Sequence, residues 1–303
     1  MESFNQLQKE IVQYKKEKNA LILAHYYVPI EVQDIADHVC DSFAMAKLAK
    51  RAQQQLIVIC GVRFMGESAK ILSPNKKVLL PAPDAGCPMA DTVTSADVLR
   101  LRKAHPKAAV VCYVNSSASV KAVSDICCTS SSALKVVRSL EEEEIIFVPD
   151  IHLGSFIAAE VPEKRFILYD GYCPTHHEIS ENDVLKAKKS HPDAVFAVHP
   201  ECRDEVIKYA DFVGSTAEIL DFAKNTLADE ILIGTEVGVT ERLIRELPNK
   251  KVYSVSAEFI CSNMKKVGLE EVRDCLKYEQ YEVTLSIDEI KAAQAALDRM
   301  VNI

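Results

Sequence analysis

The sequence contains one pattern that occurs three times. His105–Asn115 reads like His191–Glu201, which lies 86 residues further along, and Leu21–Tyr27 fits as a first copy. Each copy continues with an aspartate five residues before a serine or threonine, at Asp37, Asp125 and Asp211. Self-similarity at a fixed period is the mark of a structural unit repeated along a chain. We therefore expect three copies of one small fold.

Short apolar runs recur in the same order in each copy. We expect strands at 21–25, 56–60 and 77–80, then at 109–113, 144–148 and 165–169, and then at 195–198, 230–233 and 251–255. Polar helical segments are expected at about 4–18, 95–104, 181–190 and 269–278. Strands that alternate with helices predict parallel sheets with helices on both faces. The prediction is an α/β chain of three homologous domains, 1–104, 105–190 and 191–303 with a C-terminal extension, around a pseudo-threefold axis with a central active site.

Charge and hydropathy exclude several classes of function. The net charge is −8, whereas nucleic acids and anionic membranes select basic surfaces, so neither is an expected partner. Residues 1–20 are polar and carry no secretory signal pattern. The longest apolar runs, such as Leu21–Ala24, are too short to span a bilayer. We expect a cytoplasmic protein.

Three of the ten cysteines stand at one repeat position. Cys87 is followed by Cys173 after 86 residues and by Cys261 after a further 88, each beyond a third strand. In a reducing compartment, thiols are metal ligands more often than disulfides. Three thiolates suit zinc with an open fourth position, or a [4Fe–4S] cluster with one iron not bound by protein. The residues leave both open, although ligation by thiolates alone favours the cluster.

Polar pairs follow the first strand of each copy. They are His25 and Tyr27, Tyr113 and Asn115, and His199 and Glu201. Ligands of parallel α/β units bind at the carboxyl ends of the strands, so these pairs are expected to face one central cavity.

Hydroxyl residues precede a helical segment in each copy. They are Ser42, then Thr129-Ser130, then Ser215-Thr216. Serine and threonine at these positions are expected to act as N-caps. A helix N-terminus also attracts anions, so three of them predict a small substrate that bears carboxylates or a phosphate.

Taken together, the motifs resemble the quinolinate synthase family. The matching stretches keep the family order from about residue 20 to residue 300. They include Leu23-Ala24-His25-x-Tyr27, Cys87-Pro88-Met89-Ala90, Tyr113-Val114-Asn115-Ser116, Cys128-Thr129-Ser130, Cys173-Pro174, His199-Pro200-Glu201-Cys202, Gly214-Ser215-Thr216, Gly234-Thr235-Glu236 and Asn263-Met264-Lys265-Lys266.

The resemblance implies condensation of iminoaspartate with dihydroxyacetone phosphate to quinolinate, with release of phosphate and two waters. It implies a [4Fe–4S] cluster that acts as a Lewis acid, and the matching ligands are Cys87, Cys173 and Cys261. Substrate-binding positions match His25, Ser42, Ser130, His199, Ser215 and Thr216. Catalytic positions match Tyr27, Tyr113, Asn115 and Glu201. We expect Glu201 to be the general base, with a pKa raised by a closed site.

Other functions stay open at this point. The same residues suit another three-cysteine iron–sulfur hydro-lyase for a small hydroxy acid, an iron–sulfur sensor of a small anion, or a zinc protein. The chain departs from the family pattern at Tyr26 and at Thr175-His176-His177, which we expect at the rim of the site. A transient contact with an enzyme that produces iminoaspartate is a further expectation.

Overall fold

The computed structural model describes residues 5–303 of the chain. Its strands form three sheets of four strands each: β1 (Ala20–His25), β2 (His38–Cys40), β3 (Leu56–Cys60) and β4 (Lys77–Leu79); β5 (Ala109–Tyr113), β6 (Ile126–Cys128), β7 (Glu144–Val148) and β8 (Arg165–Leu168); β9 (Val195–Val198), β10 (Phe212–Val213), β11 (Glu230–Gly234) and β12 (Lys251–Ser254).

Helices connect and flank these strands. They are α1 (Gln6–Glu17), α2 (Ile30–Gln33), α3 (Ser42–Arg51), α4 (Arg63–Leu72), α5 (Ser95–Ala104), α6 (Ala118–Lys121), α7 (Ala133–Ser139), α8 (Ile151–Glu160), α9 (Pro174–His177), α10 (Glu181–Ser190), α11 (Asp204–Ile207), α12 (Thr216–Asn225), α13 (Val237–Glu246), α14 (Leu269–Tyr278) and α15 (Ile287–Val301), with 3₁₀ turns η1 (Ala90–Thr92) and η2 (Met264–Lys266).

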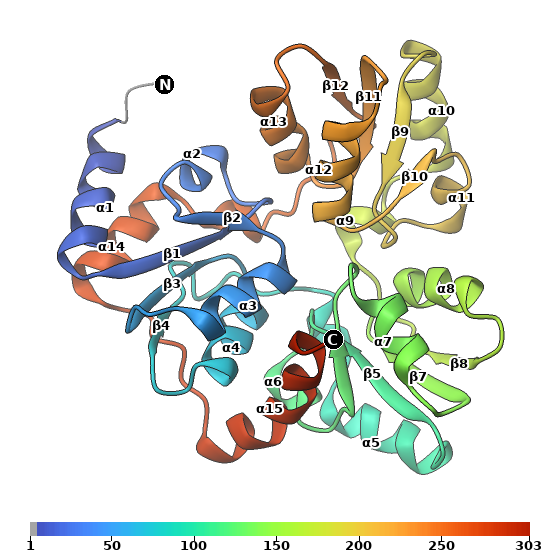
Figure 1. Cartoon of the computed structure of the whole chain (residues 1–303), viewed down its shortest axis with the longest axis horizontal. Helices are drawn as coiled ribbons and strands as arrows, with labels where there is room; N and C mark the ends of the chain where they lie inside the picture. The colour runs from blue at the N-terminus through green and yellow to red at the C-terminus, as the bar shows by residue number, and fades with distance from the viewer. Residues whose placement is uncertain (1–4) are drawn as a thin grey trace.

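The three sheets have the same topology. Their strand orders are β2-β1-β3-β4, β6-β5-β7-β8 and β10-β9-β11-β12, and all neighbours are parallel. Figure 1 shows the three α/β units side by side around a common centre, coloured blue, green and yellow to orange. The predicted fold of three small α/β units is confirmed, and each sheet lies within one of the predicted domains. The exact domain boundaries stay a prediction.

The predicted strands and connecting helices appear within one or two residues of their expected bounds. The central strands β1, β3, β5 and β7 are almost wholly apolar and buried, which is typical of parallel strands covered on both faces. The edge strands β2, β6 and β10 were not predicted. They have three residues or fewer, so no apolar period can develop in them.

The aspartate of each repeat fastens an edge strand to the first strand. Asp37, Asp125 and Asp211 each accept a hydrogen bond from a backbone N–H of that strand, at 2.8 Å, 2.7 Å and 2.8 Å. The backbone N–H of each aspartate donates in return to the same strand residue. The repeated aspartate is therefore explained by the sheet, and the same bond pair recurs in all three units.

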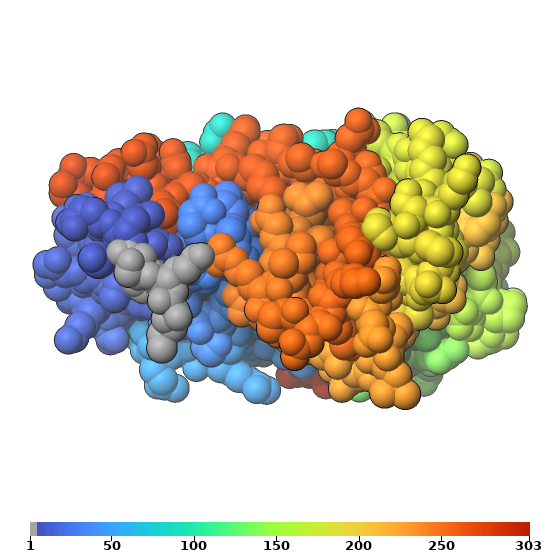
Figure 2. All heavy atoms as spheres, turned by 90° about the horizontal axis from the view of Figure 1, so that it is seen from above, coloured from blue at the N-terminus to red at the C-terminus, as the bar shows by residue number. Residues whose placement is uncertain are grey.

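The largest apolar core is continuous between the first two units. It includes residues of α14 and α15, whereas the third unit has two apolar clusters of its own. Helix α14 packs on α1, and α15 packs on α4, α6 and β6. In Figure 2 the orange-red segment lies against the blue first unit, so the end of the chain returns to its beginning. In the part of the chain that the structure describes, no helix has the length and apolar character to cross a membrane.

Candidate active site

One cavity of about 230 Å³ lies between the three units and receives residues from each of them. All but one of the predicted site residues line it: His25, Tyr27, Ser42, Cys87, Tyr113, Asn115, Ser130, Cys173, His199, Glu201, Thr216 and Cys261. The exception is Ser215, which is buried and caps α12 by accepting a hydrogen bond from the Glu218 N–H.

A buried chain of hydrogen bonds crosses the cavity wall and joins the three units. The Tyr113 hydroxyl donates to Glu201 Oε1 at 2.6 Å, and Glu201 Oε2 lies 2.9 Å from His176 Nδ1. His176 Nε2 lies 2.9 Å from Thr235 Oγ1, which in turn lies 2.9 Å from the Tyr27 hydroxyl. Glu201 accepts on both of its oxygens, whereas His176 and Thr235 can each give one hydrogen bond and accept another, so protons have a path between Tyr27 and the Glu201 carboxylate.

The carboxyl group of Glu201 is held in its ionised form. Burial alone would raise its pKa, but the contacts from His199, His176 and Tyr113 outweigh burial, so that its pKa lies well below the usual range. The expectation that the closed site raises this pKa is therefore wrong. The electrostatic interaction with His199, together with the charge and hydrogen-bond interactions with His176 and Tyr113, exceeds the cost of desolvation here.

Two histidines at the strand ends are neutral at physiological pH. Burial lowers the pKa of His25 to about 3 and that of His199 to about 4. Each imidazole accepts a hydrogen bond through Nδ1 from a backbone N–H two residues on, at 3.2 Å from Tyr27 N and 3.3 Å from Glu201 N. This fixes the neutral tautomer with Nε2–H as the donor, available to a ligand.

Asn115 and the two tyrosines present neutral polar groups. The Oδ1 of Asn115 is buried and has no hydrogen-bond partner within residues 5–303. Because a buried acceptor without a partner is costly, this oxygen is suited to receive a donor from a ligand in the cavity. Burial raises the pKa of Tyr27 and of Tyr113 well above the usual value, so both side chains are protonated phenols.

The prediction of a hydroxyl residue as N-cap is correct, at the predicted residues, for one of the three helices. Ser215 caps α12, but Asp41 caps α3 and Ser132 stands at the cap position of α7. Ser42 is instead the first residue of its helix, and Ser130 lies in the turn before its helix. At α3 the Asp41 carboxylate accepts from the Ala44 N–H at 2.8 Å and so occupies the cap position.

Within residues 5–303, the residues that line the cavity include acidic side chains but neither lysine nor arginine. Asp41, Glu178 and Glu201 all contribute to it. Lys265 lies nearby, but its Nζ is engaged by the Tyr27 carbonyl at 2.8 Å and by Glu236 Oε1 at 2.9 Å. An anionic ligand would therefore be bound by neutral N–H and O–H donors.

The three cysteines of the repeat meet at this cavity, each at the start of a short helical turn. Cys87 precedes η1, Cys173 precedes α9 and Cys261 precedes η2. Backbone N–H groups of the following turn donate to each sulfur. All three thiols are free. Three soft donors with N–H groups directed at their sulfurs fit a thiophilic metal centre.

The thiols are protonated in the absence of a metal ion. Burial raises the pKa of Cys87 to about 12, and it also raises the pKa values of Cys173 and Cys261. Binding of a metal would therefore release protons, because thiolate is the ligand form.

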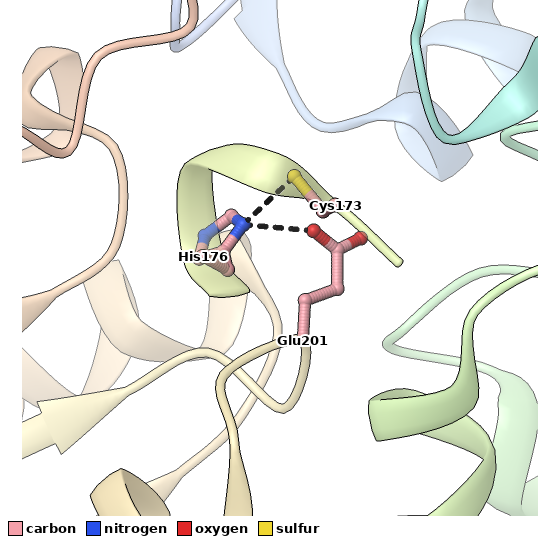
Figure 3. Close-up of side chains that lie close together, drawn as sticks. All are labelled: Cys173, His176 and Glu201. Carbon is pink, nitrogen blue, oxygen red and sulfur yellow. Dashed lines mark hydrogen bonds and ion pairs between the residues drawn. The ribbon is translucent and has the colours of Figure 1, made fainter. Parts of the chain in front are cut away.

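His176 and Thr235 are the site residues that the sequence interpretation missed. Figure 3 shows His176 pointing at both Cys173, with Nδ1 to Sγ at 3.3 Å, and Glu201. The potential ligand atoms of these three residues all lie within 4.8 Å of one another. His176 lies at the centre of the site instead of its rim, and only its position three residues after Cys173 could have indicated this.

The neighbours of His176, Thr175 and His177, which also differ from the family pattern, lie in different places. Thr175 lines the cavity, as a rim residue would. His177 lies outside it, stacked on Tyr172 with ring centroids 4.0 Å apart and bonded to His152 at 2.8 Å. Tyr26 also lies outside the lining.

Comparison with known proteins identifies the family. Residues 9–302 match the family model of the quinolinate synthetase A protein. The chain is 53% identical over 295 residues to the quinolinate synthase of Caldicellulosiruptor bescii, and the aligned residues make up 97% of each chain. It is 50% identical over 296 residues to that of the archaeon Methanosarcina barkeri, covering 98% of this chain and 97% of the relative. The chain therefore belongs to the quinolinate synthetase A protein family and is an enzyme of the quinolinate synthase type.

Proposed function

We propose that the enzyme condenses iminoaspartate with dihydroxyacetone phosphate to quinolinate, in NAD biosynthesis, and releases phosphate and two waters. The observation that carries this proposal is the buried chain from Tyr113 through Glu201, His176 and Thr235 to Tyr27, beside three free thiols in one cavity. The family membership supports it independently.

The reaction balances without an oxidant or a reductant. The seven carbons of quinolinate come from the four of iminoaspartate and the three of the triose, and the lost groups are phosphate and water. The protein therefore has to join two carbon atoms, move protons and remove hydroxyl groups. These are tasks for acid–base residues in a site shielded from water.

The substrates are proposed to be held by neutral donors. Nε2–H of His25 and of His199, the hydroxyls of Ser42 and Ser130, and the start of α12 at Ser215 and Thr216 face or adjoin the cavity. These groups can bind carboxylate and phosphate oxygens without a lysine or arginine. Asn115 Oδ1 would accept a hydrogen bond from the nitrogen or a hydroxyl of a substrate.

Proton transfer is proposed to be centred on Glu201. Its carboxylate takes a proton from the reacting carbon or nitrogen, and the Tyr113 hydroxyl at 2.6 Å supplies or withdraws a proton on the other oxygen. His176 and Thr235 connect this carboxylate with the Tyr27 hydroxyl. A proton taken up at one side of the cavity can thus be returned at the other side.

Cys87, Cys173 and Cys261 are proposed to hold a [4Fe–4S] cluster. When bound, this group would supply a Lewis acid at the iron that has no protein ligand. We also propose that iminoaspartate is handed over in transient contact with the enzyme that produces it, because a free imine hydrolyses in water.

An anaerobic experiment tests the function. The purified enzyme is analysed for iron and sulfide and is assayed with iminoaspartate and dihydroxyacetone phosphate for quinolinate and phosphate. The expected result is about four iron atoms per chain and one phosphate per quinolinate. In Cys87→Ala, cluster and product should both be lost.

Cys275→Ala is the matched control, since Cys275 is a buried thiol in α14 outside the cavity lining. It should retain iron and activity. A colourless protein that contains zinc and is stable in air would contradict the cluster. Product formation from a hydroxy acid, but not from the two named substrates, would favour a hydro-lyase instead.

A further inference from the structure

Two fully buried carboxylates accept hydrogen bonds from the backbone of two of the three cysteines. Neither belongs to the hydrogen-bond chain that runs from Tyr113 to Tyr27. Asp150 and Glu236 are both 0% exposed. The Cys173 N–H donates to Asp150 Oδ2 at 3.2 Å, and the Cys261 N–H donates to Glu236 Oε1 at 3.2 Å. The same contact, at the same distance, thus occurs in two repeats.

Each carboxylate uses its second oxygen to start the following helix. Asp150 Oδ1 accepts from the Leu153 N–H at 2.7 Å, at the N-terminus of α8. Glu236 Oε2 accepts from the Gly238 N–H at 2.7 Å, at the N-terminus of α13. One side chain therefore connects a helix N-terminus to a cysteine loop, and both of its oxygens act as acceptors.

In the first repeat, as far as the structure describes it, no carboxylate links the start of the helix to the loop that carries Cys87. There Val62 stands at the matching position, before α4. A backbone hydrogen bond nevertheless links the start of the helix to the cysteine loop in every repeat. The N–H groups of Arg63, Ile151 and Val237 donate to the carbonyls of Ala85, Gly171 and Phe259, at 2.9 Å, 2.7 Å and 2.8 Å. Since this bond recurs without a carboxylate at position 62, the fold of the loop does not require one.

The surroundings of the two carboxylates also differ from each other. Lys265 pairs with Glu236 at 2.9 Å, and the same ammonium group binds the carbonyl of Tyr27 at 2.8 Å. Asp150 has no lysine or arginine partner within residues 5–303. Glu236 therefore connects the Cys261 loop to the catalytic strand end of the first unit, whereas Asp150 acts on the Cys173 loop alone.

We propose that Asp150 and Glu236 are positioning residues that orient Cys173 and Cys261 for metal binding, by fixing the backbone N–H of each cysteine so that its sulfur faces the cavity. Among the described residues, Cys87 is the ligand without such a carboxylate, since Val62 stands at the matching position. This inference rests on the proposed role of the three cysteines as ligands. It requires neither a particular cluster nor a particular substrate.

The test uses Co²⁺ as a probe of the thiolate site in the full chain, reduced and free of metal under anaerobic conditions. Co²⁺ bound to thiolate gives a charge-transfer absorption that a merely folded protein lacks. Asp150→Ala and Glu236→Ala should each weaken Co²⁺ binding by about 10- to 100-fold, as is typical for loss of a group that orients a metal ligand. Asp150→Asn and Glu236→Gln should give intermediate losses, because an amide has one acceptor oxygen for two N–H groups.

Ser286→Ala is the matched control. It removes the N-cap of α15, where Ser286 Oγ accepts from the Glu289 N–H at 3.2 Å, and touches no cysteine. Its Co²⁺ affinity should be unchanged, and circular dichroism verifies that every variant is folded. If an alanine variant does not fold, its amide counterpart provides the test.

Two results would overturn the inference: Co²⁺ binding of unchanged affinity in the folded position-150 and position-236 variants, or an equal loss in Ser286→Ala. Because no substrate is present, this outcome is separate from that of the proposed function. If the protein without substitutions forms no quinolinate, the proposed function is wrong, but the positioning role of Asp150 and Glu236 is not contradicted.

Discussion

The Tyr113 hydroxyl donates to Glu201 Oε1 at 2.6 Å, although the two residues lie in different repeats and both are buried. The phenol from β5 of the second unit thereby reaches a carboxylate that follows β9 of the third. This contact stabilises the ionised carboxylate, so the acid–base chemistry of the site depends on the juxtaposition of two units.

Tyr113→Phe is expected to lower kcat by about 10²-fold, because it removes a proton donor that contacts the proposed base. The hydroxyl also helps to hold the pKa of Glu201 below its usual range, so its loss raises that pKa. The acidic limb of the kcat–pH profile should therefore move to higher pH. Tyr169→Phe, which removes an exposed hydroxyl bonded to the Thr92 carbonyl at 2.8 Å, should leave the profile in place.

Thr235→Val is expected to reduce kcat while leaving the fold intact. The change preserves volume but removes the hydroxyl that lies 2.9 Å from both the Tyr27 hydroxyl and His176 Nε2. Thr240→Val is the control, since the Thr240 hydroxyl is buried without a partner within residues 5–303, and its removal should be neutral or stabilising. Equal activity of the two variants would contradict a role for Thr235 in proton transfer.

The stability of the metal-free protein should fall as the pH is lowered from about 6.5 towards 4. The pKa of His199 is about 4 in the folded protein against 6.5 for the free side chain. Between these values the unfolded chain binds a proton that the folded chain does not, at up to about 1.4 kcal/mol per pH unit. Urea unfolding at several pH values should show a shallower slope for His199→Asn than for the unchanged protein. Parallel slopes would mean that the folded protein accepts the proton.

Asp211→Ala is expected to destabilise the third unit. The change leaves the buried Phe196 N–H without the acceptor that it has at 2.8 Å, which costs about 1–3 kcal/mol. Because the apolar clusters of this unit are separate from the core of the other two, the effect should be local. Hydrogen exchange should accelerate in β9 and β10 but not in β5 and β6. Asp193→Ala, an exposed aspartate in the same unit, should have no such effect.

Local patterns determined most of the fold. The three apolar runs per repeat placed β1, β3 and β4 and their counterparts within one or two residues, because buried parallel strands are continuous apolar segments between polar helices. The edge strands β2, β6 and β10 do not follow from the pattern, because two or three residues hold no period. Their place is set by the aspartate that bonds back to the first strand, as at Asp37 and Ile22.

The sequence by itself also determined which side chains gather at the centre. A fixed repeat places residues at equivalent positions, so the cysteines and strand-end pairs had to meet wherever the three units meet. Tertiary structure alone decided what these residues do to one another. His176 joins Glu201 to Thr235, and Asp41 displaces Ser42 as a cap, through contacts that no local period encodes. The direction in which the pKa of Glu201 shifts likewise depends on the balance between burial and the groups that contact its carboxylate. Only the assembled site fixes that balance.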